Sequence, residues 1–215
     1  MAERHEDFAF CYAGSLLIDS DGGIMRNRDV NKWGRRARKE AAYFDGRQFA
    51  ARNLYWKNYV INASGVLFRR QYALNLVESD FIRMRCCGDW LFWFQMALQG
   101  GVGMIYRNLN YFRQHTAKVT VASTRSGESI REGLQVVQKM EKELPLLKEY
   151  KKRLCRGRFY RRIKRSSLSE ECKEELFDEL SAVLGGTVAD YCLERLNQFL
   201  RVLNPFILTP GRDRL

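Results

Sequence analysis

The stretch Cys87–Gly101, CGDWLFWFQMALQGG, joins a single acid to a long run of apolar side chains. Eight of the eleven residues from Trp90 to Gly100 are apolar or aromatic, and Asp89 stands directly before them. The length of this run predicts a buried helix of about three turns. A carboxylate at a helix start accepts hydrogen bonds from backbone N–H groups, and glycine often ends a helix. We therefore expect Asp89 at the N-terminus of this helix and Gly100-Gly101 at its end.

The residues around this helix predict a mixed α/β region. A strand or strand pair is expected at 8–18, FAFCYAGSLLI, closed by the turn DSDGG at 19–23. A polar, aperiodic stretch at 26–48 predicts a loop or insertion. The remaining expectations are a β-rich run at 59–68, a short helix near 69–77 and a strand with a polar exit at 102–115.

After about Ser123 the pattern changes to helical periodicity, which predicts a helical region over 124–215 behind an α/β region over 1–123. A capping box of Ser167 with Glu170 is expected to open one helix. Three apolar faces are predicted, namely Ile130, Leu134, Val137, Met140 and Leu144; Cys172, Leu176, Leu180 and Val183; and Val188, Cys192, Leu196, Phe199 and Leu203.

The composition indicates a chain that packs a core in a reducing compartment. Apolar residues make up 46% of the 215 residues, which argues against wholesale disorder. Six cysteines without C-x-x-C spacing and only two histidines argue against a disulfide framework or a zinc site. The start of the chain lacks the pattern of a signal peptide, and no apolar run is long enough for a membrane span. The expected location is the cytoplasm, with the inner face of a membrane as a peripheral site.

The net charge of +12 points to a polyanionic neighbour, and much of it lies in one segment. Residues Lys148–Arg165 contain ten basic residues against the single acid Glu149, and no clean amphipathic face. The segment is open to three interpretations: a solvated basic linker or surface helix, a contact with an anionic membrane, or a contact with a nucleic-acid strand through interleaved aromatics. Nucleic acid is the less favoured partner, because the sequence has no helix-turn-helix, RRM or zinc motif.

Three short stretches, taken in order, resemble a known enzyme family. INASGVLFRR at 61–70, CGDWLFW at 87–93 and LNYFRQH at 109–115 are similar to the acceptor-side half of family 2 glycosyltransferases, and YAGSLLIDSDGG at 12–23 resembles the segment that leads into it. The resemblance extends over about residues 8–122. It implies a partial GT-A-like mixed sheet with flanking helices, followed here by the all-helical region. It also implies an enzyme that transfers a sugar from a nucleotide-sugar donor to a glycan or lipid-linked acceptor, with inversion.

The resemblance also implies roles for individual residues. Asp89 corresponds to the general base that takes the proton from the acceptor hydroxyl. Arg113 and His115 lie near the leaving diphosphate, where His115 is a candidate ligand of Mn²⁺ or Mg²⁺. The expected acceptor-binding residues are Ser64, Gly65, Gly88 and Trp90. Each has a plainer alternative: Asp89 as a helix cap alone, Arg113 and His115 as an exposed basic pair, Ser64 and Gly65 as tight packing, and Trp90 as a core residue.

Asp19-Ser20-Asp21 spells the D-x-D signature by which this family binds metal and nucleotide sugar, but its position after a strand and before Gly22-Gly23 predicts a hairpin turn. The nucleotide-binding half of the family is not visible in the sequence, so it is open whether this chain binds donor by itself. Two other functions also remain open, a basic nucleic-acid-binding protein and a non-catalytic interaction module.

Overall fold

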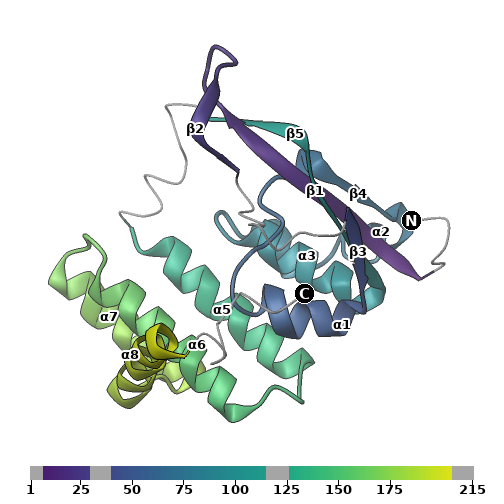
Figure 1. The fold of residues 1–215 in the computed structure, drawn as a ribbon. Helices are drawn as coiled ribbons and strands as arrows, with labels where there is room; N and C mark the ends of the chain where they lie inside the picture. Colours follow the sequence, from purple (N-terminus) through teal and green to yellow (C-terminus); the bar gives the residue numbers. More distant parts are fainter. Residues whose placement is uncertain (1–6, 30–39, 115–125, 205–215) are drawn as a thin grey trace. The chain divides into compact units, whose positions relative to one another are not determined.

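The computed structural model describes residues 7–29, 40–114 and 126–204 (Figure 1). These residues form two compact units, a sheet unit of residues 7–82 and 89–114 and a helical unit of residues 83–88 and 126–204. The expected mixed α/β class with a helical C-terminal region is confirmed. The expected boundary between 123 and 124 lies outside the described residues.

The sheet unit is a five-stranded mixed sheet with short helices and one longer helix. Its strands are β1 (Phe8–Ile18), β2 (Ile24–Asp29), β3 (Ala41–Phe44), β4 (Val66–Phe68) and β5 (Gly101–Arg113). Its helices are α1 (Gly46–Phe49), η3 (Ala50–Leu54), η4 (Ala63–Gly65), α2 (Arg70–Leu74), η5 (Asp80–Arg83) and α3 (Gly88–Gln99), of which η5 and α3 each carry one terminal residue of the helical unit.

The long strand β1 organises the sheet. It pairs in parallel with β5, and its other edge pairs antiparallel with β4 near its start and with β2 near its end. The strand β3 pairs antiparallel with the far edge of β5. Strands β1 and β5 are the predicted ones at 8–18 and 102–115, and both are confirmed.

Aromatic side chains join α3 to this sheet. Trp93 of α3 packs against Phe10 of β1, with ring centroids 5.2 Å apart, and against Phe68 of β4, with centroids 6.1 Å apart. Phe10 and Trp93 are both buried. The apolar run after Asp89 is therefore a core helix, as its composition predicted.

Two sequence expectations for the sheet unit were wrong in part. The stretch 26–48 was expected to be a loop, yet it holds the end of β2, all of β3 and the start of α1. The strands β2 and β3 lie at the edges of the sheet, and hydrogen bonds to β1 and β5 define them although their own pattern is weak. The β-rich run at 59–68 forms a strand only over β4, because Asn62 accepts a hydrogen bond from the Ser64 N–H and starts η4 instead.

Close contacts, and not a left-handed helix cap, require the glycine pair after α3. Neither glycine has the positive φ of a left-handed cap. A Cβ on Gly100 would lie 2.2 Å from the Asp7 carbonyl oxygen, and one on Gly101 would lie 2.0 Å from the Tyr43 hydroxyl oxygen. The pair is needed because other backbone and side-chain atoms approach it closely.

The helical unit contains α5 (Glu128–Glu143), α6 (Glu149–Lys164), α7 (Glu170–Leu184) and α8 (Val188–Leu203). The predicted apolar face of α5 is confirmed, since all five of its residues are buried. In α7 the cap is Ser169, whose hydroxyl accepts from the Cys172 N–H at 3.3 Å, so the predicted capping box at Ser167 was wrong. The predicted apolar face of α8 lies in helical register as expected, but its side chains are exposed.

The basic segment Lys148–Arg165 contains the helix α6, which packs against the other three helices of this unit. It buries Leu154, Phe159 and Ile163, so it is neither a linker nor a fully solvated helix. A Cβ on Gly157 would lie 2.2 Å from the Asp190 carbonyl oxygen of α8. The glycine that weakens the helix by itself thus permits the close contact between α6 and α8.

Candidate functional site

The carboxylate of Asp89 lies in the first turn of α3, next to the buried Gly88. Its Oδ1 accepts a hydrogen bond from the Trp90 N–H at 2.7 Å. Its Oδ2 accepts from the side-chain amide of Asn58 at 2.8 Å. The expected contact between the acid and a backbone N–H of the helix start is present, and the amide of Asn58 adds a second support that the sequence did not suggest. These two bonds fix the direction of the carboxylate.

The surroundings of Asp89 make it more basic than an ordinary aspartate. Burial by nearby protein atoms raises the pKa of the Asp89 carboxyl, and hydrogen bonds from the Trp90 N–H, from its own N–H and from Asn58 oppose this in part. The residue as a whole nevertheless remains exposed. A carboxylate that is partly desolvated but reachable from solvent has the properties of a proton acceptor.

Asn58 belongs to a segment that lies along the start of α3. Its Oδ1 accepts from the Val60 N–H at 3.0 Å, which orients the amide toward Asp89. The indole N–H of Trp90 donates to the Leu54 carbonyl at 2.7 Å. Trp90 is only 8% exposed, so the structure favours the core role for this residue over sugar stacking. The hydrogen bonds from Asn58 to Asp89 and from Trp90 to Leu54 hold the segment from Leu54 to Asn58 against the first turn of α3.

Asn58 lies between Lys57 and Tyr59 in the sequence, and Tyr59 is near Tyr12 of β1. Lys57 Nζ lies 4.5 Å from the ring centroid of Tyr59. Burial raises the pKa of Tyr12 well above its ordinary value, and the neighbouring hydroxyls of Tyr59 and Tyr106 raise it further. Tyr12 is a core residue and the Tyr59 hydroxyl is also buried, so these phenols belong to the interior of the sheet unit. No short motif marks these residues, because they come from β1, β5 and an irregular segment.

The predicted acceptor residues Ser64 and Gly65 lie on η4, which rests on β1 and β5. A Cβ on Gly65 would lie 3.1 Å from the Asn110 side-chain nitrogen and 3.5 Å from the Ala13 carbonyl oxygen, so tight packing accounts for this glycine. Ser64 is exposed. It follows Asn58 by six residues, a chain length that spans at most about 20 Å. The segment 58–65 thus connects the carboxylate site with η4.

Arg113 is engaged at the turn between β1 and β2. Its Nη1 donates to the carbonyls of Ser20 at 2.7 Å and Asp19 at 3.2 Å. Asp19 Oδ1 accepts from the Asp21 and Gly23 N–H groups at 3.0 and 2.7 Å, and Gly22 has a φ of +92°. The hairpin-turn interpretation of the D-x-D sequence is confirmed. The role of Arg113 at a diphosphate stays a prediction, and His115 lies outside the described residues.

The expected divalent metal has no test among the described residues, because the candidate ligand His115 lies outside them. Among them no group of three or more histidine, cysteine, aspartate or glutamate side chains is placed to hold a metal ion. Asp19, the first acid of the D-x-D sequence, uses its Oδ1 within the turn. The expected Mn²⁺ or Mg²⁺ therefore rests on the resemblance alone, and no chemical step is assigned to it.

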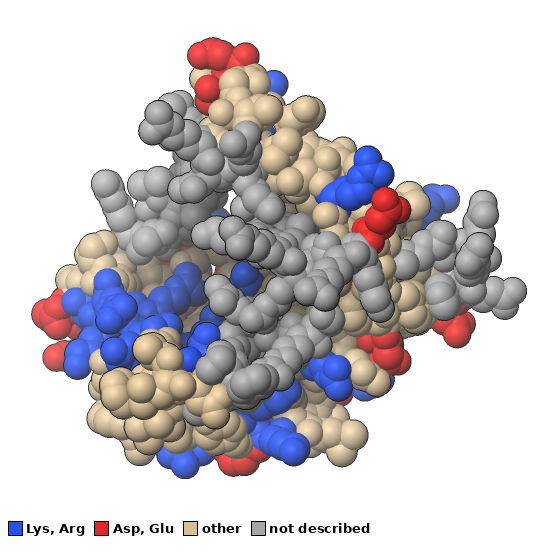
Figure 2. All heavy atoms as spheres, viewed as in Figure 1, with Lys and Arg blue, Asp and Glu red and all other residues tan. Residues whose placement is uncertain are grey.

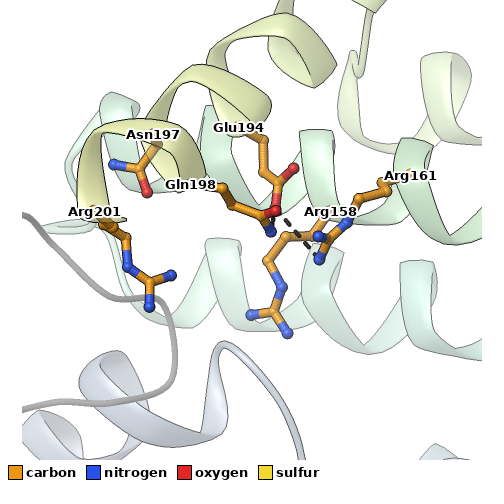
Figure 3. A pocket seen from close by; sticks show the side chains of 6 residues that line it. All are labelled: Arg158, Arg161, Glu194, Asn197, Gln198 and Arg201. Carbon is orange, nitrogen blue, oxygen red and sulfur yellow. Dashed lines mark hydrogen bonds and ion pairs between the residues drawn. The ribbon is translucent and has the colours of Figure 1, made fainter. Parts of the chain in front are cut away.

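The helical unit holds a separate small pocket of about 140 Å³ (Figure 3). Arginines from α6 and α8 and polar groups of α8 line it, namely Arg158, Arg161, Glu194, Asn197, Gln198 and Arg201. Glu194 pairs with Arg161 at 3.4 Å and accepts from the Gln198 amide. Three guanidinium groups against one carboxylate make the pocket positive, but Glu194 pairs with Arg161 and Asn197 donates to Tyr150, so part of its lining serves the contact between α6 and α8.

Comparison of the chain with family models, with curated proteins and with solved structures found no match. Within the described ranges, no helix is long and apolar enough to cross a membrane.

Proposed function

We propose that the sheet unit is the acceptor-side part of a family 2-like glycosyltransferase, with Asp89 as the general base. The carboxylate of Asp89 is the observation that supports this most directly. It is held by Asn58 and the Trp90 N–H, its pKa is raised by burial, and the residue is exposed. The Asn58 amide adds a partner from outside the helix to the backbone contact of the carboxylate.

The proposed reaction is a single displacement. The hydroxyl of a glycan or lipid-linked acceptor donates a hydrogen bond to a remaining lone pair of the Asp89 carboxylate. As the acceptor oxygen forms a bond to the anomeric carbon, its proton passes to Asp89, and the bond to the nucleoside diphosphate breaks with its electron pair. Because burial disfavours the charged carboxylate, Asp89 gains by taking the proton. Asn58 keeps the carboxylate in place during this transfer.

The first experiment asks whether this chain binds a donor. Thermal melting would be followed with UDP, GDP and dTDP sugars, each with and without Mn²⁺. A ligand that binds only the folded chain at 100 times its Kd adds about 2.7 kcal/mol of stability, which is visible as a raised midpoint. A raised midpoint would assign a donor site to this chain. An unchanged midpoint would restrict the chain to the acceptor side, with the donor half supplied from elsewhere.

The second experiment tests the base directly. Sugar transfer would be measured for Asp89→Asn and Asn58→Ala, with Asp178→Asn as a control that removes the same charge from an exposed position on α7. We expect Asp89→Asn to lower the rate by about 10²–10⁴-fold and Asn58→Ala to lower it less. The control should keep the full rate. Transfer that survives in Asp89→Asn would overturn the assignment and leave a non-catalytic interaction module as the alternative.

Nucleic-acid binding is supported by the charge of +12 but not by the contacts of α6. Tyr160 packs against Phe177 at 4.4 Å and Tyr191 at 5.2 Å between ring centroids, and Phe159 is buried. These aromatics serve the packing of the helices, so they do not form a stacking surface for bases. Salt-sensitive binding of the chain to unrelated DNA or RNA would reverse this preference.

A further inference from the structure

The helix α8 has its polar residues inside and its apolar residues outside. Its buried residues are Asp190, Glu194 and Asn197. Its exposed large apolar residues are Val188, Leu196, Phe199, Leu200, Val202 and Leu203, with Phe199 63% and Val202 83% exposed. On a helical wheel the two sets lie on opposite sides. Most soluble helices have the reverse arrangement, so the exposed set needs a partner outside the helical unit.

The inward polar face of α8 is committed to its own unit. Asp190 accepts from Arg153 of α6 at 2.7 Å and from the Thr187 N–H at 3.1 Å. Glu194 pairs with Arg161 of α6, and the Asn197 amide donates to the Tyr150 hydroxyl at 2.8 Å. Rotating α8 to bury its apolar side would separate these charges from their partners, which is costly inside a protein. The apolar face is therefore a stable outward surface.

The charge that accompanies this face is positive. Both acids of α8 are buried, and Arg195 is exposed beside the apolar residues. Figure 2 shows a tan area over α8 with blue lysine and arginine atoms at its border. A face of leucine, valine and phenylalanine with basic residues at its edge is typical of a helix that lies in the boundary layer of an anionic membrane.

We propose that the helical unit docks onto an anionic membrane surface through the exposed face of α8. In this arrangement Phe199, Val202 and Leu203 enter the layer between headgroups and acyl chains, and Arg195 contacts lipid phosphate. This contact differs from a purely electrostatic one through Lys148–Arg165, several arginines of which pair with carboxylates inside the unit. The proposal does not depend on the proposed enzymatic function.

A second copy of the chain fits this face less well than a membrane. A stable protein interface buries about 800 Å² on each partner and uses roughly 20–30 residues a side, which one face of a single helix does not supply. A symmetric dimer across α8 would also bring the two copies of Arg195 toward one another. A lipid surface needs no matching shape and is attracted by the same arginine.

Vesicle co-sedimentation of the full chain tests the proposal. Vesicles of phosphatidylcholine with about 30% phosphatidylserine would be compared with vesicles of phosphatidylcholine alone, at low and at physiological salt. The variants are Phe199→Ser with Leu203→Ser, and Arg195→Gln. The matched control is Leu67→Ser, which removes a 70% exposed apolar side chain from β4 of the sheet unit. All variants change exposed residues, so equal thermal midpoints would show that they are folded.

We expect the wild type and the Leu67→Ser control to bind the anionic vesicles alike. The double variant should bind at least tenfold more weakly, because it loses apolar contact with the lipid. Arg195→Gln should bind roughly fivefold more weakly, and this difference should shrink in high salt. Equal binding of the double variant and the wild type would overturn the proposal. So would a wild type that ignores both vesicles but forms a dimer that the double variant does not form, since a second copy would then be the partner.

Discussion

The helices α3 and α8 both carry acids among large apolar side chains, yet they turn opposite faces to their neighbours. In α3 the tryptophans are buried and Asp89 is exposed. In α8 the acids Asp190 and Glu194 are buried and Phe199 is exposed. The partners explain the difference. The neighbours of Trp93 are Phe10 and Phe68, whereas α8 packs on α6, whose Arg153 and Arg161 require carboxylates.

The comparison shows that the partner of an amphipathic helix decides which of its faces is buried. An aromatic surface selects apolar side chains because it offers no hydrogen bonds. An arginine-rich helix allows carboxylates to be buried because its guanidinium groups pair with them, and a buried carboxylate without a partner is costly. Each helix keeps the remaining residues exposed to solvent. On α3 the exposed residue is Asp89, the candidate general base, and on α8 the exposed residues form the proposed membrane face.

The largest expected effect comes from removing one aromatic side chain from each helix. Trp93→Ala should lower the free energy of unfolding by about 3–5 kcal/mol, because Trp93 is 3% exposed and packs against Phe10 and Phe68. Phe199→Ala should change it by no more than about 0.5 kcal/mol, because that side chain meets solvent. Urea denaturation of the two variants measures both. Equal losses would mean that α8 is covered in solution.

The second prediction concerns the inward acids of α8. Asp190→Ala should cost about 2 kcal/mol, because it removes the cap at Thr187 and leaves Arg153 without its carboxylate. Since Arg153 is partly exposed, water compensates for some of the loss. Asp178→Ala, at an exposed position of α7, is the matched control and should be neutral. A neutral Asp190→Ala would show that the polar face of α8 does not hold the unit together.

The close contact between α6 and α8 gives a third prediction. Gly157→Ala should lower the stability by about 1–2 kcal/mol, since the new Cβ would lie 2.2 Å from the Asp190 carbonyl oxygen. Alanine normally stabilises a helix relative to glycine, so the sign itself is informative. Thermal melting of this variant beside Ser181→Ala, an exposed change on α7, measures the effect. A raised midpoint would mean that the two helices are farther apart than described.

The smallest expected effect is the pH dependence of Asp89. Burial raises its pKa above the ordinary 3.8, so the folded chain binds this proton more tightly than the unfolded chain. Ionisation therefore lowers the stability as the pH rises from 3.8 through the raised value. Asp89→Asn lacks this loss of stability. The difference between its melting midpoint and that of the wild type should therefore increase as the pH rises through this window and remain constant at higher pH. A difference that is constant with pH would show that burial does not raise the pKa of the Asp89 carboxyl.

The candidate site was predictable only where one residue marks it. An acid directly before a long apolar run located Asp89 at a helix start, because helix capping is a local property. The support from Asn58 was not predictable, since that amide lies 31 residues earlier in an irregular segment. The contact of Arg113 with the turn carbonyls was not predictable from the sequence either, because it depends on the pairing of β1 with β5.

The sequence by itself determined the elements that carry a strong local pattern. Strand β1, helix α3, strand β5 and the helices α5, α7 and α8 follow from runs of apolar residues and their period, which depend only on residues one or two turns apart. Only the tertiary structure decided the edge strands β2 and β3 and the outward face of α8. The strands β2 and β3 depend on hydrogen bonds to neighbouring strands of the sheet, and the outward face of α8 depends on the arginines of α6. These partners are distant in the sequence, so a local pattern carries no information about them.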